Sequence, residues 1–344
     1  MNPELPFIKG LDLNRGYYRD IVKPILEQHF PGLPYTAALI GYGSDVLGMD
    51  TAISMDHNWG PRMLIFVDDK GLIPEIDKCL GEHLPFQYKF YPTNFTDPRY
   101  DATQSMVSTD KKPVRHLIEI CTLEDYLREK YALEKNVNLS HVEWLALADQ
   151  QLLELTSGEV FHDGLDRLNS IREELAFYPE DICKLRLAVL WDYISNKEAF
   201  VGRCLALEDH AGIKINAGRL VNYLMKIFFY LERKYIPYSK WFGSAFRKLE
   251  ISASAYPLVM DALNENNPAK IEERLNALYT LAVERHNAAA WLPPIDNKIR
   301  DYFNRPYSVI FAETIVKKIM ESIKDPEIKS LDLGKQALDI ILDR

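Results

Sequence analysis

Residues 35–67 read YTAALIGYGSDVLGMDTAISMDHNWGPRMLIFV, and this stretch decides the fold. It opens with the apolar run YTAALI at 35–40 and closes with RMLIFV at 62–67. Short continuous apolar runs of this kind are typical of buried strands. A glycine-containing loop and the segment Asp56-His57-Asn58-Trp59 lie between the two runs. We therefore expect two buried strands connected by a polar loop.

The flanking sequence predicts helices around these strands. Apolar residues recur at helical spacing from 17 to 30, where Pro31-Gly32 ends the pattern, and again from 74 to 84. A further strand is expected at 114–121, followed by Thr122 as the N-cap of the next helix. FQYKF at 86–90 also alternates like a strand. The first 135 residues therefore predict an α/β domain.

After residue 136 the strand-like runs nearly vanish and helical periodicity dominates. This change of pattern predicts an α/β domain at 1–135 and an all-helical domain at 136–344. The expected helices of the second domain lie at 142–155, 163–176, 180–195, 197–209, 217–234, 239–250, 267–288 and 308–324.

Composition and charge restrict the classes of function. The 344 residues carry a formal net charge of -9, which disfavours nonspecific binding to a nucleic-acid backbone. The N-terminal residues lack a basic region followed by an apolar run, and no apolar run approaches the ~20 residues of a membrane helix. The four scattered cysteines predict free thiols rather than disulfides or a zinc site. We expect a cytoplasmic protein.

Two short segments contain the candidate residues for binding phosphate and metal. They are Gly43-Ser44 and, after eleven intervening residues, Asp56 to Asn58. Glycine lets backbone amides approach phosphate closely, and a serine hydroxyl adds a donor. On a strand, Asp56 and Asn58 at i and i+2 would face the same side, and Mg²⁺ prefers such oxygen ligands. Glu119, inside the run HLIEI, is the best candidate for a third ligand from a neighbouring strand.

This pattern resembles the nucleotidyltransferase superfamily with the DNA-polymerase-β-like fold. A closer resemblance is to the DUF4037 domain family, carried by SMDHNWGPR at 54–62, GEVFHDG at 158–164, LAFYP at 175–179 and PYSKWFG at 237–243. The resemblance implies an α/β (α+β) N-terminal nucleotidyltransferase-fold domain with a mixed sheet, followed by an all-α helical domain. The sequence departs from the superfamily pattern at Asn58, where that pattern has a carboxylate.

The resemblance also implies a reaction and its residues. Asp56, Asn58 and Glu119 would act as catalytic residues and hold Mg²⁺, while a hydroxyl acceptor attacks the α-phosphate of a nucleoside triphosphate, with ATP the expected one. The expected nucleotide-binding residues are Gly43, Ser44, Asp45, Arg62 and Lys240. A small-molecule acceptor is expected rather than RNA, and a homodimer is compatible with a helical domain of this kind.

Alternatives remain open at several of these positions. Asp56 is otherwise a capping residue, Arg62 part of a structural salt bridge, Lys240 a surface lysine and Glu119 a partner of Arg115. Asn58 removes a negative charge, which weakens metal binding unless Asp45 or Asp50 substitutes. The protein is then a nucleotide-binding module with a degenerate site. A third alternative is a toxin-like transferase that modifies tRNA or a protein.

Overall fold

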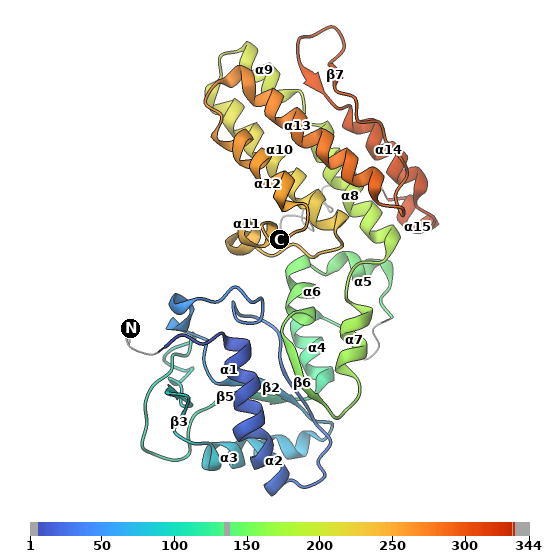
Figure 1. The fold of residues 1–344 in the computed structure, drawn as a ribbon. Coiled ribbons are helices and arrows are strands. Elements are labelled where there is room, and N and C mark those ends of the chain that lie inside the picture. Colours follow the sequence, from blue (N-terminus) through green and yellow to red (C-terminus); the bar gives the residue numbers. More distant parts are fainter. Residues whose placement is uncertain (1–5, 134–137, 332, 334–344) are drawn as a thin grey trace. The chain divides into compact units, whose positions relative to one another are not determined.

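The computed structural model describes residues 6–133, 138–331 and 333. The chain forms two compact units (Figure 1). The first contains residues 1–138 and 151–176, and the second contains residues 139–150 and 177–344.

The first unit contains a mixed four-stranded sheet in the order β5-β2-β1-β6. Its strands are β1 (Thr36–Leu39), β2 (Arg62–Phe66), β5 (Leu117–Cys121) and β6 (Glu159–Asp163). β1 is antiparallel to β2 and β6, whereas β2 is parallel to β5. The strands expected at 35–40, 62–67 and 114–121 are thereby confirmed.

Two local expectations were wrong. Asp56 was expected on a strand, but it ends the 3₁₀ helix η2 (Ala52–Asp56), and Asn58 has a φ of 48°. A left-handed residue cannot continue a strand, so Asp56 and Asn58 do not share a strand face. Residue 163 was expected to begin a helix, but it ends β6, and α7 (Leu168–Glu174) begins later.

β6 also explains why the units differ from the predicted domains at 1–135 and 136–344. β6 pairs with β1 at the register Thr36↔Asp163 and Leu39↔Glu159. This pairing joins residues 151–176 to the sheet, although the sequence places them among helices. Strand pairing is non-local, so the neighbouring residues of β6 do not predict it.

Helices cover one face of the sheet. They are α1 (Gly10–Tyr17), the π-helix η1 (Tyr18–Val22), α2 (Lys23–His29) and α3 (Ile73–His83). Their apolar side chains form one core with the strand residues that point to this face, namely Ala37, Met63, Ile65 and Ile118. The expected helices at 17–30 and 74–84 correspond to this layer.

The opposite face of the sheet carries polar as well as apolar side chains. Arg62, Leu64 and Phe66 alternate with the core residues of β2, and Glu119 lies beside Leu64. α4 (Leu123–Tyr131) follows β5, and its Tyr126 ring contacts Phe66 edge-on at 5.2 Å. Thr122 caps α4 by accepting a hydrogen bond from the Asp125 amide, as predicted. The remaining elements of this region are η3 (Lys70–Leu72), β3 (Gln87–Tyr88) and β4 (Tyr91–Pro92).

The second unit is helical apart from one short hairpin among its described residues. α8 and α10 are its long central helices, and α14 packs on α8 while α13 packs on α10. Its elements are α5 (His141–Ala146), the start of α6 (Asp149–Thr156), α8 (Glu180–Ser195), α9 (Phe200–Ala206), α10 (His210–Leu231), α11 (Ser239–Phe246), α12 (Ser252–Asn264), α13 (Pro268–Ala288), β7 (Arg300–Asp301), β8 (Ser308–Val309), α14 (Ala312–Ser322) and α15 (Pro326–Lys329). No helix in the described ranges combines the length and apolar character needed to cross a bilayer.

A polar network lies among the helices of the second unit. The Asp149 carboxylate accepts hydrogen bonds from the hydroxyls of Tyr178 at 2.7 Å and Tyr230 at 2.8 Å. The Arg186 guanidinium lies 4.1 Å from the centre of the Tyr178 ring and donates to the Leu147 carbonyl at 3.1 Å. Burial raises the pKa of Asp149, although the charge of Arg186 opposes that shift. The network connects residues 147–149 with α8 and α10.

Gly158 gives a test of the β1–β6 pairing. Its φ is 72°, and an added Cβ would lie 2.0 Å from the Leu39 carbonyl oxygen. Gly158→Ala should therefore cost about 3 kcal/mol of unfolding free energy, since both strain and a backbone clash arise. Gly48, at a φ of 62° with open space around it, is the matched control, and Gly48→Ala should cost about 1 kcal/mol. Urea denaturation measures both, and equal losses would contradict the backbone clash.

Candidate functional site

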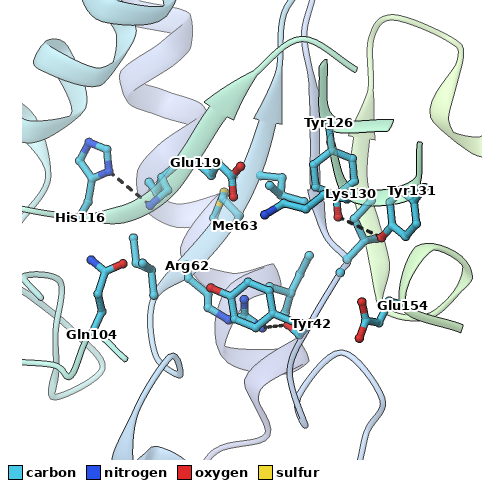
Figure 2. A pocket seen from close by; sticks show the side chains of 16 residues that line it. Tyr42, Arg62, Met63, Gln104, His116, Glu119, Tyr126, Lys130, Tyr131 and Glu154 are labelled. Atoms are coloured by element: carbon cyan, nitrogen blue, oxygen red, sulfur yellow. Dashed lines mark hydrogen bonds between the residues drawn. The ribbon is translucent and has the colours of Figure 1, made fainter. Parts of the chain in front are cut away.

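A cavity of about 310 Å³ opens on the sheet face that α1–α3 leave uncovered. Its wall combines the ends of β1, β2 and β5 with α4 and part of α6. Figure 2 shows Tyr42, Arg62, Glu119 and Lys130 around the same space. The polar and aromatic residues of the wall are Tyr42, Arg62, Gln104, His116, Glu119, Tyr126, Lys130, Tyr131 and Glu154.

A buried ion pair fixes the loop that borders this cavity. Arg62 Nη2 lies 2.7 Å from Asp45 Oδ1, and Arg62 Nε donates to Asp45 Oδ2 at 3.1 Å. Both residues are buried, and Arg62 Nη2 also donates to the Tyr42 carbonyl at 2.9 Å. Burial alone lowers the pKa of Arg62, but the Asp45 carboxylate reverses the effect and raises it above its usual value. The structural salt bridge at Arg62 is therefore present, with Asp45 as its partner.

Gly43 is required by this ion pair. Its φ is 134°, and an added Cβ would lie 2.2 Å from Asp45 Oδ1 and 2.4 Å from Arg62 Nη2. Ser44 follows, half-buried, and its carbonyl accepts the Met49 amide at 2.7 Å. The described wall of the cavity includes Gly41 and Tyr42 but not Gly43 or Ser44. Phosphate binding by Gly43 and Ser44 stays a prediction.

Asp56 and His57 form a local pair at the surface. Asp56 Oδ2 lies 2.9 Å from His57 Nδ1, and Asp56 Oδ1 accepts the His57 amide at 3.0 Å. About half of each side chain is exposed, at 48% for Asp56 and 50% for His57. One oxygen edge of Asp56 therefore remains open to a ligand from solvent.

The segment with Asp56 and Asn58 is connected to the cavity through Gln104. The Asn58 amide donates to the carbonyls of Thr103 and Gln104, each at 3.0 Å. The Ser105 hydroxyl donates to the Asp56 carbonyl at 3.2 Å. Gln104 itself lines the cavity, whereas Asp56 and Asn58 are not among its described wall residues. The structure therefore places Asp56 and Asn58 against a wall segment, and Glu119 in the wall itself.

Glu119 occupies β5, which is an edge strand of the sheet. It pairs with Leu64 in the parallel register of β2 and β5, and it is exposed. Its exposure removes the desolvation cost that a buried carboxylate would carry. Arg115, the alternative partner, lies 3.3 Å from Asp97 and donates to the Phe95 carbonyl. Glu119 is thus free of that structural pairing and points to the cavity.

Sequence reasoning missed Lys130 and its aromatic neighbours. Lys130 lies in the last turn of α4 and lines the cavity, although Glu124–Lys130 reads as a solvated helix face. The hydroxyls of Tyr126 and Tyr131 lie 3.4 Å apart, and burial raises the pKa of both. The usable signal is the i, i+4 spacing of Tyr126 and Lys130, which places these two on one side of a helix directly after the Glu119 strand.

Asp50 and Lys240, the two remaining candidates, are not among the described wall residues of the cavity. Asp50 is buried and accepts hydrogen bonds from the Gly10 amide at 2.7 Å and Trp59 Nε1 at 3.3 Å. It also pairs with Lys9 at 3.3 Å, so it acts as a structural anchor for the loop. Lys240 belongs to the second unit, on α11, with its Nζ 4.9 Å from the Trp241 ring centre. Its phosphate role stays a prediction.

Residues 144–242 match the family described as Domain of unknown function (DUF4037). The match contains GEVFHDG at 158–164, LAFYP at 175–179 and all but the last residue of PYSKWFG at 237–243. It confirms the DUF4037 resemblance in this part of the chain, while SMDHNWGPR at 54–62 lies outside it. Comparison with curated proteins and with solved structures found no match.

The Arg62–Asp45 pair predicts a large loss of stability when one partner is removed. Asp45→Asn leaves a buried guanidinium without its counter-charge, which should cost about 3–5 kcal/mol in urea denaturation. Replacing both partners by apolar residues, Asp45→Leu with Arg62→Met, should recover part of that loss. Glu27→Gln, which breaks the exposed Lys23–Glu27 pair, is the control and should cost about 0.5 kcal/mol. Similar losses for Asp45→Asn and Glu27→Gln would contradict the assignment.

Proposed function

We propose that the first unit binds a nucleoside triphosphate with Mg²⁺ at the cavity and transfers its nucleoside monophosphate to a hydroxyl acceptor. The observation that carries the proposal is the Glu119 carboxylate, which lines one cavity with the cations of Lys130 and Arg62 beside the loop of the Gly43-Ser44 turn. Carboxylates bind Mg²⁺, and the Lys130 ammonium offsets phosphate charge, whereas the charge of Arg62 is compensated by Asp45. The mixed sheet is compatible with a nucleotidyltransferase fold.

The size of the cavity supports binding of the phosphate end of a nucleotide rather than of the whole molecule. At about 310 Å³ it lies at the lower limit of small-molecule pockets, which are about 300–1,000 Å³. Phosphates and a hydrated cation fill such a space, and the nucleoside then extends beyond it. We therefore expect affinity to depend on the triphosphate more than on the base.

The residues present have the oxygen donors that Mg²⁺ requires. Glu119 would hold it from the cavity wall, and Asp56 and Asn58 from the segment that Gln104 connects to that wall. When bound, Mg²⁺ neutralises charge that develops on the phosphates. Lys130 would hold a phosphate oxygen by charge, and Ser44 would donate to another.

The reaction joins the acceptor oxygen to the α-phosphorus and breaks the bond from that phosphorus to the bridging oxygen of the β-phosphate. Pyrophosphate leaves, and the acceptor hydroxyl loses its proton. Asn58 cannot accept this proton, so Asp56 or Glu119 is the side chain that would receive it. The net charge of -9 favours a small-molecule acceptor over RNA.

One observation favours a second function, nucleotide binding without transfer. Of the three proposed Mg²⁺ ligands, Glu119 is the one that lines the cavity. Asp56 is paired with His57, and Asn58 carries no charge. A single carboxylate with cations is sufficient to bind Mg-nucleotide, whereas two-metal transfer requires more negative charge. Measuring pyrophosphate release from ATP, in the presence of pools of small molecules or of tRNA as acceptors, distinguishes transfer from binding alone. Tight binding without release supports the binding module.

Calorimetric titration of ATP, GTP, CTP and UTP in Mg²⁺ tests the site. Glu119→Gln should weaken Mg-ATP binding about tenfold, because it removes a metal ligand charge worth about 1.4 kcal/mol. Glu129→Gln, at an exposed position of α4 outside the cavity wall, is the matched control and should bind like the wild type. The proposal fails when no nucleotide binds, or when Glu119→Gln binds as tightly as Glu129→Gln.

Asn58→Asp tests the role of the missing carboxylate. A φ of 48° is tolerated by both Asn and Asp, so the change adds charge without backbone strain. Mg-ATP should bind about threefold to tenfold tighter, while ATP in excess chelator should bind more weakly through charge repulsion. Unchanged affinity in Mg²⁺ would show that Asn58 lies outside the metal site.

A further inference from the structure

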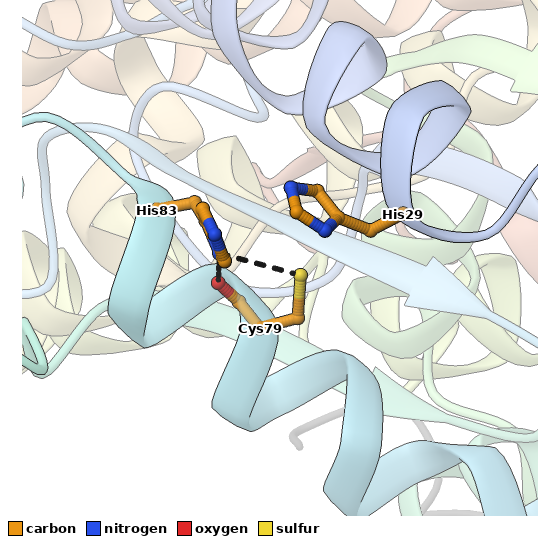
Figure 3. A group of neighbouring side chains, drawn as sticks. All are labelled: His29, Cys79 and His83. Carbon is orange, nitrogen blue, oxygen red and sulfur yellow. Dashed lines mark hydrogen bonds between the residues drawn. The ribbon is translucent and has the colours of Figure 1, made fainter.

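His29, Cys79 and His83 come together on the helical side of the sheet. Each offers one ligand atom, and these three atoms lie within 4.8 Å of one another (Figure 3). Cys79 Sγ lies 3.6 Å from His83 Nδ1, and the rings of His29 and His83 are 4.1 Å apart between centres. Tetrahedral zinc with bonds of about 2.0–2.3 Å needs donor atoms about 3.5 Å apart, so small side-chain rotations complete the geometry.

The backbone that carries these ligands is firmly held. Cys79 and His83 lie at i and i+4 of α3, which places them on one face of that helix, and His29 is the last residue of α2. α2 and α3 pack against each other. Leu26 of α2 and Ile76 and Leu80 of α3 are buried in the same core. The ligands are therefore brought together by packing that does not depend on a metal.

The donor chemistry selects the type of ion. One sulfur and two imidazole nitrogens suit zinc and related divalent transition metals, whereas Mg²⁺ requires oxygen donors. His83 Nδ1 lies 2.8 Å from the Cys79 carbonyl oxygen, an acceptor for the N–H of that nitrogen. While Nδ1 keeps this contact, Nε2 is the nitrogen of His83 that binds the ion, and a backbone carbonyl is a usual partner for the other nitrogen of a metal-bound histidine. The 3.6 Å from Cys79 Sγ to Nδ1 then places the ring beside the thiol and is not a distance between two ligand atoms.

We propose that His29, Cys79 and His83 bind one zinc-type divalent ion, with water as the fourth ligand. On binding, the Cys79 thiol releases its proton to solvent and the thiolate binds the ion. His29 and His83 are exposed, so the ion has access from solvent and an open position remains. The bound ion links the end of α2 to α3 and stabilises the helical layer of the first unit.

This site is independent of the proposed function. It lies on the face covered by α1–α3, whereas the cavity lies on the opposite face. Its soft donors and the oxygen donors of the cavity select different ions. A failure of nucleotide binding therefore leaves this proposal intact, and the reverse also holds.

Titration of the tag-free, chelator-treated full chain with Co²⁺ tests the proposal. The wild type should bind one Co²⁺ per chain with a thiolate-to-cobalt absorption band, and Zn²⁺ should displace it. Cys79→Ser should abolish the band. His29→Gln and His83→Gln should weaken binding about tenfold or more. Cys204→Ser and His210→Gln, at a half-buried thiol and an exposed histidine of the second unit, are the matched controls.

A stability measurement provides a second readout. Zn²⁺ should raise the midpoint of thermal unfolding of the wild type and both controls, because a ligand that binds the folded chain stabilises it. It should not raise the midpoint of Cys79→Ser or His29→Gln. His29 is exposed at a helix end, so His29→Gln remains folded when Cys79→Ser does not. Absence of the cobalt band in the wild type, or its persistence in Cys79→Ser, overturns the proposal.

Discussion

The charge of Arg62 has to be compensated where β2 begins, and that constraint organises the first unit. A guanidinium buried at the start of a strand is stable only beside a carboxylate with matching geometry. Asp45 provides it by folding the loop after β1 back against β2. That loop path brings residue 43 so close to both side chains that no Cβ fits. The glycine turn and the ion pair are therefore one structural unit.

The two faces of the sheet follow from the alternation of side chains along β2. Met63 and Ile65 point to the helical layer, which becomes a dry core. Arg62 and Leu64 point to the other face, where the neighbouring β5 contributes Glu119. α4 covers only part of this face, so polar groups there keep contact with solvent. The cavity arises because a polar face is incompletely covered, and the same geometry explains why Glu119 carries no burial cost.

Local pattern predicted the strands at 35–40, 62–67 and 114–121, but it could not predict what depends on distant partners. β6 is stabilised by pairing with β1, and its sequence EVFHD lacks a continuous apolar run. The i and i+2 spacing of Asp56 and Asn58 was interpreted as a strand, although the turn through Asn58 and Gly60, both at positive φ, prevents one. Lys130 looked like a solvated residue because only the fold shows that α4 borders a cavity.

The site residues could likewise be recognised from the sequence only in part, because their partners are distant along the chain. Arg62 and Asp45 were both candidates for nucleotide contact, and the sequence left open whether Arg62 forms a salt bridge. Its partner could not be identified, since 16 residues separate the two along the chain. Cys79 and His83 have a spacing that fits a helix, but His29 precedes them by two strands and several loops. A third ligand at that distance is visible only after α2 and α3 have packed.

The match at 144–242 also bears on how the motifs are interpreted. It includes Asp149, Tyr178, Arg186 and Tyr230, which form the polar network of the second unit. A buried carboxylate held by two hydroxyls and a nearby guanidinium tolerates few substitutions, because losing one partner leaves a desolvated charge. Segments such as LAFYP at 175–179 can therefore be required by packing alone. The chemical role of the first unit depends instead on Glu119 and Lys130, because their arrangement on a half-covered sheet face has no comparable structural necessity.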